Sequence, residues 1–349
     1  MDRYYTRACN FYYGKDSENR IKLNQSLPLT GRKDISFDYV ELVSRNSKKK
    51  ISIHKINKLP KKIKNKVKKD LIKITNKVKN FLKLNFSKEI HIMGILNITP
   101  DSFSDGGKYK ETRKAIKHMS KLFNDGASIV DIGGESTRPG SKTIREDQEW
   151  NRIKDVLKEI KKNKIISVDT RKSFIMKKSL SMGAKIINDV SGLSFDKETI
   201  TVLKKTNSPF VLQHSLGNPE NMQKNPKYKN VILDIYDFFE QKLNFVKNSG
   251  IKHDKIILDP GIGFGKNLSH NLQILKDISI FHTLGFPILL GISRKRFIRD
   301  IAQTNDSNER LGGTISSSIY ALKQGVQILR VHDVNEMKQG IKVYQELIK

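Results

Sequence analysis

A parallel α/β fold, a (β/α)₈ barrel, is the architecture that this sequence predicts, and three observations predict it. Short apolar runs alternate with amphipathic, helix-compatible stretches from about residue 91 onward, the pattern of buried parallel strands separated by helices. The runs number roughly eight, as a closed barrel requires. Each run also ends in polar residues, and barrel enzymes carry their active sites at the C-terminal ends of their strands. The pattern therefore predicts an enzyme as well as a fold.

The predicted strands can be followed in order by the polar residue at which each one ends. The first strand, residues 91–96, ends at Asn97, and the second, residues 128–130, ends at Asp131. The other strands end, in chain order, at Asp169, Asn188, His214, Asp259, Ser293-Arg294-Lys295 and Arg330-Val331-His332-Asp333. Because the ends of parallel strands meet at one face of a barrel, we expect these side chains to converge.

The size and composition fit a soluble barrel with an appended segment. The chain has 349 residues, and one such barrel takes about 250. Cys9 is the single cysteine, so an internal disulfide is excluded and a reducing compartment is favoured. No apolar run approaches the roughly 20 residues that span a bilayer, and residues 1–5 lack the apolar core of a signal peptide. We expect a cytoplasmic protein without a membrane partner.

The basic residues are concentrated near the N-terminus. The formal net charge is +30, and residues 1–90 carry 24 Lys and Arg against 8 Asp and Glu. Most of these cations are lysines, which act as solvated point charges and lack the bidentate geometry of arginine. The distribution therefore favours a solvated, lysine-coated surface, and we regard nucleic acid as an unlikely partner despite the charge.

Residues 1–88 form a basic N-terminal extension of unknown role, and residues 89–349 form the catalytic barrel domain in this interpretation. Residues 1–50 mix aromatic and small apolar side chains that can form a couple of strands. Between residues 60 and 84, apolar residues recur at helical spacing, which predicts one amphipathic helix with a lysine-coated outer face. Such a helix can plug the bottom of the barrel or lie along its side.

Three of the predicted loops carry groups suited to chemistry. Residues 97–107 (NITPDSFSDGG) follow the first strand and are rich in hydroxyls and carboxylates. Residues 131–141 (DIGGESTRPGS) combine glycines with an arginine that can grip an oxyanion. Residues 259–266 (DPGIGFGK) resemble a phosphate cradle but follow a strand that ends in a carboxylate. Taken singly, each loop is also compatible with ordinary turn chemistry.

Together, these motifs resemble the dihydropteroate synthase family, folate-pathway enzymes with a pterin-binding TIM barrel. The resemblance covers roughly three quarters of the chain, from about residue 91. It rests on residues 97–107, 133–140, 167–170, 187–190, 259–266, 293–295 and 330–333, in the expected order. It implies a transferase that condenses 6-hydroxymethyl-7,8-dihydropterin pyrophosphate with 4-aminobenzoate, giving 7,8-dihydropteroate and pyrophosphate. It further implies Mg²⁺ as a cofactor, a homodimer, and inhibition by sulfonamides.

The resemblance also implies roles for individual residues. Asp169, Asn188 and Asp259 would bind the donor edge of the pterin, and Lys295 would donate to its acceptors. Buried carboxylates suit this task because an unpaired polar group in a closed pocket costs several kcal/mol. Asp169, Asp259 and Lys295 are also the residues expected to be catalytic. A strand-end Asp can instead be a helix N-cap.

The same resemblance assigns the pyrophosphate to three further residues. Asn97 would contact the metal or the diphosphate, while Arg330 and His332 would hold the phosphates. Negative charge builds on the leaving group, so cationic and hydrogen-bonding groups aimed at it lower the barrier. The family implies a dissociative route without a side-chain nucleophile, and the sequence shows no activated Ser or Cys arrangement. His332 taken alone can equally be a core histidine.

The aminobenzoate site and the closing loops are implied to contain Phe103, Thr137, Arg138, Pro139 and Phe264. Loops that close over such a site exclude water from a reactive intermediate. The chain departs from the family pattern at two places. Arg296 stands where a small serine near the aminobenzoate is common, and Gln213 and Ser215 flank His214 where methionines are common.

Two other functions compete with this interpretation. A methyltetrahydrofolate-dependent methyltransferase can share the Asp/Asn/Asp pterin pocket, but does not need the 97–101 loop or the Arg330 and His332 phosphate grip. A noncatalytic basic binding protein on an inactive barrel would have lost motif residues, and here they are intact. Both alternatives are therefore disfavoured.

Overall fold

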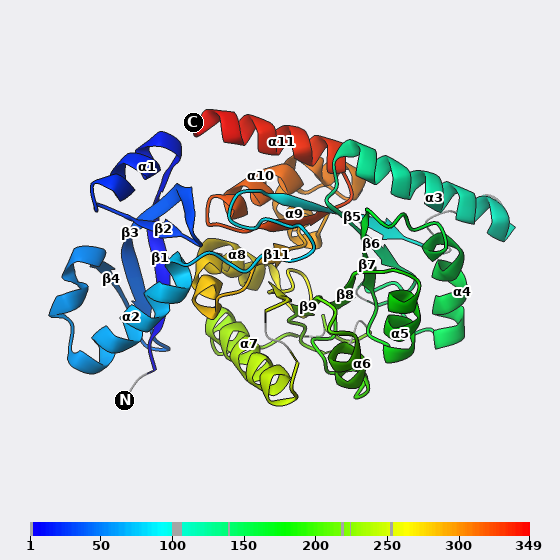
Figure 1. Cartoon of the computed structure of the whole chain (residues 1–349), viewed down its shortest axis with the longest axis horizontal. Helices are drawn as coiled ribbons and strands as arrows, with labels where there is room; N and C mark the ends of the chain where they lie inside the picture. The colour runs from blue at the N-terminus through cyan, green and yellow to red at the C-terminus, as the bar shows by residue number, and fades with distance from the viewer. Residues whose placement is uncertain (1–2, 100–106, 139, 218–219, 224, 252–253) are drawn as a thin grey trace.

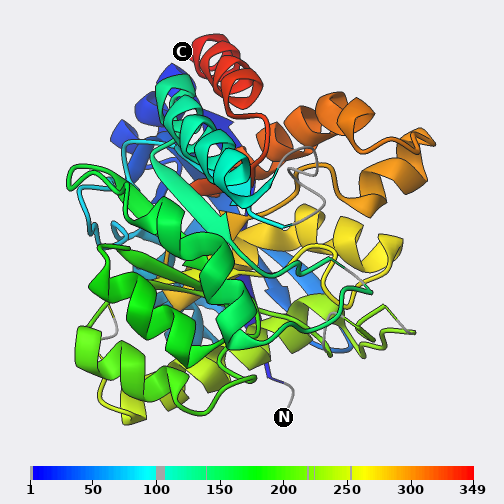
Figure 2. The same cartoon turned by 90° about the vertical axis from the view of Figure 1, so that its right-hand side faces the viewer.

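The computed structural model describes residues 3–99, 107–138, 140–217, 220–223, 225–251 and 254–349. It has two parts: a small antiparallel sheet with its own helices at the N-terminus, and a parallel barrel built by the rest of the chain. In Figure 1 the N-terminal part, in blue, lies to one side of the barrel, next to α7 (Val231–Asn248) and α8 (Leu268–Asp277). Figure 2 looks onto the barrel, with the N-terminal part behind it.

The barrel is an eight-stranded parallel sheet, as the sequence predicts. Its strands are β5 (His91–Asn97), β6 (Ile129–Gly133), β7 (Ile165–Asp169), β8 (Ile186–Asp189), β9 (Phe210–Gln213), β10 (Ile256–Asp259), β11 (Leu289–Leu290) and β12 (Ile328–Val331). Their order is β10-β9-β8-β7-β6-β5-β12-β11. A parallel bridge between Leu258 and Ile288 brings the two ends of this order together and nearly closes the barrel.

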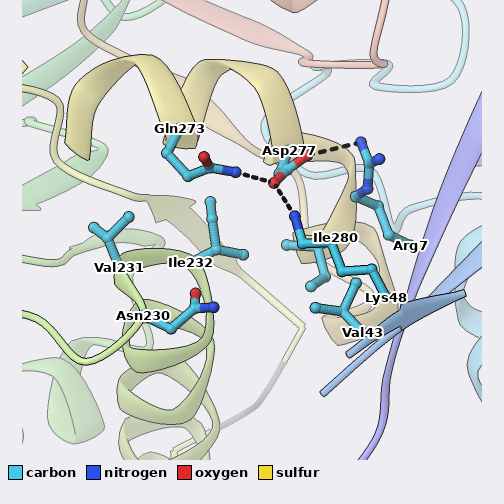
Figure 3. A pocket seen from close by; sticks show the side chains of 9 residues that line it. All are labelled: Arg7, Val43, Lys48, Asn230, Val231, Ile232, Gln273, Asp277 and Ile280. Atoms are coloured by element: carbon cyan, nitrogen blue, oxygen red, sulfur yellow. Dashed lines mark hydrogen bonds and ion pairs between the residues drawn. The ribbon is translucent and has the colours of Figure 1, made fainter. Parts of the chain in front are cut away.

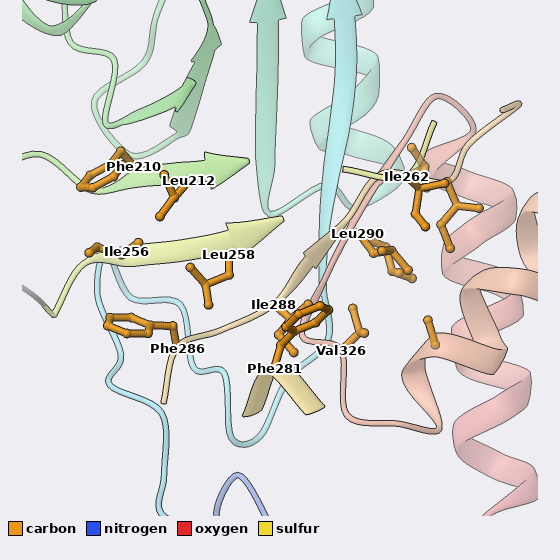
Figure 4. Close-up of a cluster of buried hydrophobic side chains, with 14 of the residues drawn as sticks. Phe210, Leu212, Ile256, Leu258, Ile262, Phe281, Phe286, Ile288, Leu290 and Val326 are labelled. Atoms are coloured by element: carbon orange, nitrogen blue, oxygen red, sulfur yellow. The ribbon is translucent and has the colours of Figure 1, made fainter. Parts of the chain in front are cut away.

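Helices surround the strands and cover their outward-facing apolar side chains. Besides α7 and α8, they are α3 (Gly107–Asp125), α4 (Glu146–Leu157), α5 (Ser173–Ser181), α6 (Thr199–Thr206), η3 (Ile278–Leu284), α9 (Arg296–Ala302), η4 (Asn308–Arg310), α10 (Leu311–Leu322) and α11 (Val334–Leu347). The strands are buried on both faces, which explains why they read as continuous apolar runs. Figure 4 shows part of this core, where Phe210, Leu258 and Ile288 come from neighbouring segments of the barrel. In the described ranges, every helix is too short or too polar to cross a bilayer.

The bottom of the barrel is filled by the segment that precedes β5. Phe81, Leu84 and Phe86 belong to one buried cluster with the inward-facing residues Met93 and Ile328. The amphipathic helix predicted for residues 60–84 is shorter than expected: α2 spans Lys61–Thr75 and ends where Asn76 turns extended, at φ −72° and ψ 150°. The apolar residues beyond it therefore plug the barrel as an irregular segment rather than as a helix.

The N-terminal unit is more regular than the couple of strands that the sequence suggests. It contains β1 (Tyr5–Tyr13), α1 (Gly14–Lys22), β2 (Leu27–Leu29), β3 (Arg32–Val43), β4 (Lys48–Ser52), η1 (Ile53–Lys58) and α2. β3 pairs antiparallel with β1 on one side and with β2 and β4 on the other. Residues such as Phe37, Val67 and Ile74 give the unit its own buried core. The domain boundary after residue 88 stays a prediction.

The N-terminal unit is joined to the barrel by ion pairs. Arg7 and Lys48 both contact Asp277 at the end of α8, with N···O distances of 3.1 and 3.3 Å. These side chains line a cavity of about 300 Å³ between the two parts, seen in Figure 3. Farther along, Arg45 bridges Asp234 and Asp237 of α7 at 2.7 and 2.9 Å. The charged side chains that line the cavity are thus paired with one another, across the contact between the N-terminal unit and the barrel.

Candidate active site

The carboxyl ends of β6, β7, β8 and β12 bring four of the predicted polar residues into direct contact. Arg330 donates from Nε to Asp131 Oδ2 and from Nη2 to Asp169 Oδ2, each at 2.7 Å. Asn188 donates from Nδ2 to the same Asp131 oxygen at 2.9 Å. The three acceptor-bearing residues are almost fully buried. The strand ends therefore converge as the sequence predicts, around one arginine.

This cluster presents unsatisfied acceptors to its interior. Among the residues that the structure describes, Asp131 Oδ1, Asp169 Oδ1 and Asn188 Oδ1 are buried without a hydrogen-bond partner. A buried acceptor without a partner is costly, so three together indicate a site completed by a ligand with several N–H donors. Burial raises the pKa of Asp169, and the Arg330 guanidinium opposes that shift.

Asp259 and Lys295 lie at the ends of neighbouring barrel segments. Asp259 is the last residue of β10, and its Oδ1 accepts a hydrogen bond from the backbone N–H of Gly261 at 2.7 Å. Burial raises the pKa of Asp259. Lys295 immediately precedes α9, and its Nζ lies 4.1 Å from the ring centroid of Phe264. Burial lowers the pKa of Lys295 to about 8, and the Asp259 carboxylate partly opposes this shift.

His332 is held by the segment that carries Lys295. The Ser293 hydroxyl accepts a hydrogen bond from the His332 backbone N–H at 3.2 Å and lies 3.0 Å from His332 Nδ1. Burial, with help from the Arg330 cation, lowers the pKa of His332 to about 3. The imidazole is therefore neutral near pH 7, and a hydroxyl donating to Nδ1 leaves Nε2–H as a donor.

The predicted loop residues are only partly described. Phe103 and Pro139 lie outside the described residues. Thr137 is half-buried and Arg138 is exposed, and the Arg138 carbonyl accepts from the Ser141 hydroxyl at 2.7 Å. The Arg138 charge contributes to the lowered pKa of His332, so the loop lies on the same side of the site as that residue.

A buried ion network supports this loop from below. Glu135 accepts from Arg171 at 3.0 Å and from Lys172 at 3.1 Å, and Lys172 also pairs with Glu149 of α4 at 2.6 Å. All four side chains are at most 4% exposed. Arg171 also donates to the Thr143 hydroxyl at 2.9 Å. Since Arg171 and Lys172 follow Asp169 closely, the network joins the Asp169 loop to the loop that carries Arg138.

The structure separates three residues from the polar cluster. Arg296 lies at the start of α9 with a largely exposed side chain, 3.7 Å from Asp300. His214 is buried beneath the site, where its Nδ1 lies 3.0 Å from Lys266 Nζ. Gln213 is buried and donates to the Val190 carbonyl at 3.5 Å. His214 and Gln213 thus contact the loops after β10 and β8.

Sequence reasoning assigned no role to Asp131 or Ser293, although both contact predicted site residues. Asp131 has the same signal as Asp169, a carboxylate following an apolar run. Its pairing with Arg330 joins residues 199 positions apart, which no local pattern reveals. Lys266 also received no role of its own, although it ends the glycine-rich motif of residues 259–266.

The site offers little to a metal ion by itself. Over the described stretches of chain, no three His, Cys, Asp or Glu side chains gather as ligands. Asn97 and Asp169 both lie beside Gly133, where a Cβ would be in ordinary contact with Asn97 Oδ1 at 3.4 Å and with Asp169 Cβ at 3.6 Å. Such a site fits Mg²⁺ held chiefly by substrate phosphates and water, as this ion commonly is.

Comparison with known proteins identifies the class to which this fold and site belong. The family model described as pterin binding enzyme matches residues 93–332, well over half of the chain. The barrel, with buried hydrogen-bond acceptors at its strand ends, is therefore that of a pterin-binding enzyme.

More particular similarity comes from individual proteins. The dihydropteroate synthase of Escherichia coli K12 is 41% identical over 257 residues, which are 73% of this chain and 90% of that protein. A Yersinia pestis dihydropteroate synthase structure with a sulfonamide drug complex has a TM-score of 0.71 at 38% identity, covering 76% of this chain and 96% of that one. A Xanthomonas albilineans dihydropteroate synthase structure with 4-aminobenzoic acid has a TM-score of 0.70 at 33% identity. The match covers 74% of this chain and 93% of that one. The chain belongs to the dihydropteroate synthase family.

The pKa of Lys295 predicts an alkaline limit to activity. Below about pH 8 the side chain is an ammonium ion, and above it the charge is lost. We expect kcat/KM for the pterin substrate to fall as pH rises through about 8, because this parameter reports ionisation in the free enzyme. The Lys295→Arg variant keeps its charge and should shift or lose this alkaline limb. Rate profiles measured on both sides of pH 8 check the prediction, and an identical limb in both proteins would contradict it.

Proposed function

We propose that this chain catalyses dihydropteroate synthesis, the condensation of 6-hydroxymethyl-7,8-dihydropterin pyrophosphate with 4-aminobenzoate in folate biosynthesis. The observation that carries the proposal is the set of three buried acceptors without partners around Arg330. A pterin has a guanidine-like edge of N–H donors that matches the Asp169 and Asn188 oxygens of this set. The solved structures with 4-aminobenzoic acid and with a sulfonamide drug support the proposed second substrate.

In the proposed mechanism, the chain's residues bind and orient the pterin first. Asp169, Asn188 and Asp259 accept hydrogen bonds from its donor edge, and Lys295 donates to its acceptors. Phe264, next to the Lys295 ammonium, supplies an apolar wall for the aminobenzoate that follows. The bond to the diphosphate then breaks, and the aminobenzoate nitrogen attacks the electron-poor methylene. The pterin residues act by preorganised hydrogen bonding and charge, which is effective in a water-poor site.

Arg330 and His332 are the proposed holders of the departing diphosphate. Two of the five N–H donors of Arg330 bind Asp131 and Asp169, so its remaining donors are available to phosphate oxygens. His332 contributes a neutral N–H donor rather than a charge. One arginine therefore links the pterin floor to the leaving group.

We also propose Mg²⁺ as the cofactor, with Asn97 providing an amide oxygen beside the diphosphate. When bound, the ion would neutralise charge that builds on the leaving group. Titration calorimetry with pyrophosphate tests this separately from turnover. Mg²⁺ should strengthen pyrophosphate binding to the native protein, and Asn97→Ala should remove most of that gain. An equal gain in the variant would exclude Asn97 as a ligand.

The overall function is tested by an assay for pyrophosphate release with the purified full-length chain. Release should require both the pterin pyrophosphate and 4-aminobenzoate. No pyrophosphate release, together with methyl transfer from methyltetrahydrofolate, would favour the competing pterin-binding methyltransferase. Gel filtration with light scattering tests the proposed homodimer, and cell fractionation tests the proposed cytoplasmic location.

Position 296 predicts a change in drug response. Arg296 is exposed at the start of α9, one residue beyond Lys295, where it can pair with the aminobenzoate carboxylate or crowd a sulfonamide. We expect Arg296→Ser to change the sulfonamide inhibition constant by several-fold and the pterin KM by less than twofold. The matched control is Arg299→Ser, one turn farther along α9. Equal shifts of both constants, or no shift in either, would contradict a contact between Arg296 and the aminobenzoate or sulfonamide.

A further inference from the structure

A buried lysine follows the glycine loop of β10 and has no part in the proposed chemistry. Lys266 is 2% exposed. Its Nζ lies 3.0 Å from His214 Nδ1, 2.9 Å from the Phe264 carbonyl oxygen and 3.5 Å from the His214 carbonyl oxygen. An amine surrounded by an imidazole nitrogen and two backbone carbonyls joins two chain segments: the loop after β9 and the loop after β10.

The same two segments interlock through their backbones. Gly261 and Gly265 have left-handed φ values of +67° and +63°. A Cβ on Gly261 would lie 2.0 Å from the His214 carbonyl oxygen, and one on Gly265 would lie 2.4 Å from that of Leu216. Only glycine permits so close an approach. The Tyr228 hydroxyl also donates to the Gly265 carbonyl at 2.9 Å, so the contact continues toward α7.

Phe264 is the residue that this junction exposes to the site. Its carbonyl is held by Lys266, while its ring lies under the Lys295 ammonium at 4.1 Å. The ring also lines a cavity of about 280 Å³, together with Ser215 and Gly217 of the loop after β9. The position of this aromatic wall therefore depends on how firmly the two loops are joined.

We propose that Lys266 and His214 form a positioning pair that fixes the Phe264 wall by locking the glycine loop to the segment after β9. This assigns His214 a role behind the site, as the partner of Lys266. Burial lowers the pKa of both groups well below their ordinary values. The two side chains therefore need not both be positively charged, and repulsion between them is avoided. The remaining polar contacts of the amine are carbonyls, which suit a structural donor.

Hydrogen–deuterium exchange tests the lock without any reference to catalysis. In Lys266→Met, amide exchange in residues 214–217 and 261–266 should accelerate about tenfold or more, because local opening becomes easier. Exchange in β5 to β7 should stay unchanged. The matched control is Lys255→Met, which removes an amine that donates to the Asn207 carbonyl at 3.3 Å, just before β10. Unchanged exchange in the two loops would overturn the proposal.

The kinetic part of the test rests on the proposed function. Lys266→Met should raise the aminobenzoate KM about tenfold and the pterin KM less than twofold, since the pterin floor is intact. Equal changes in both would indicate general destabilisation and would contradict a positioning role. If His214 acts only through Lys266, the double variant with His214→Leu should be no worse than Lys266→Met alone, and additive effects would also contradict it. An inactive native chain would refute the proposed function while leaving the exchange result intact.

Discussion

Replacing Asp169 with asparagine is expected to lower kcat/KM for the pterin substrate by about 10²- to 10³-fold, equivalent to about 3–4 kcal/mol. The asparagine oxygen can still accept from Arg330, which holds Asp169 Oδ2 at 2.7 Å. Its amide N–H₂ then replaces the unpaired Oδ1, so donor would face donor at the pterin edge. Steady-state kinetics with both substrates measures the loss.

The fold should survive this change, because asparagine has nearly the same shape. Circular dichroism and thermal unfolding should remain close to those of the native protein. Asp125→Asn is the matched control, since that carboxylate pairs with Lys121 at the surface of α3 and should leave kcat/KM unchanged. Full activity in Asp169→Asn would contradict the assignment of this residue to the pterin.

The second large effect is expected on stability, from Lys172→Met. Lys172 neutralises two buried carboxylates, Glu135 and the fully buried Glu149. Removing the cation leaves Glu149 charged without a partner, which typically costs about 3–5 kcal/mol. In a protein of 349 residues, we expect the midpoint of thermal unfolding to fall by roughly 4–7 °C. Differential scanning calorimetry at neutral pH measures this loss.

The pH dependence gives the same prediction a second check. Burial already raises the pKa of Glu149, with Lys172 opposing the shift. Without Lys172, the folded-state pKa rises further above the unfolded value, so the penalty grows as pH increases above the unfolded pKa and shrinks as the acid takes up its proton. The double variant Lys172→Met/Glu149→Gln should recover much of the lost stability. Lys158→Met removes an exposed pair with Asp155 and should cost less than about 1 kcal/mol.

The barrel was predictable because its signal is local and repeated. Each buried strand is a short apolar run, and each ends in a polar residue that the barrel brings to one face. The end of α2 was not predictable in the same way. Val78, Phe81 and Leu82 continue the helical spacing beyond Asn76, but Val78 and Phe81 are buried beneath the barrel strands. Periodicity records which residues are buried, and it does not record which surface buries them.

The polar floor of the site was predictable from motifs, and the groups that support it were not. Asp169 and Asn188 lie in recognisable strand-end motifs. Lys172, Glu149 and Lys266 read as solvated charges, because lysine and glutamate are seldom buried. Each is buried by a partner that lies far along the chain or in another loop, and such pairing leaves no periodic signal.

The joint between the N-terminal unit and the barrel has a consequence for the order in which the protein assembles. Tyr5 donates a hydrogen bond to Asp237, 232 positions later, and Arg45 pairs with Asp234 and Asp237. The ribosome therefore completes the N-terminal sheet long before the helix that pairs with it exists. Until α7 emerges, Arg45 lacks these two carboxylate partners, and its charge attracts the acidic face of that helix when it arrives. The N-terminal sheet is made before the barrel and is thus among the last parts to reach its final position.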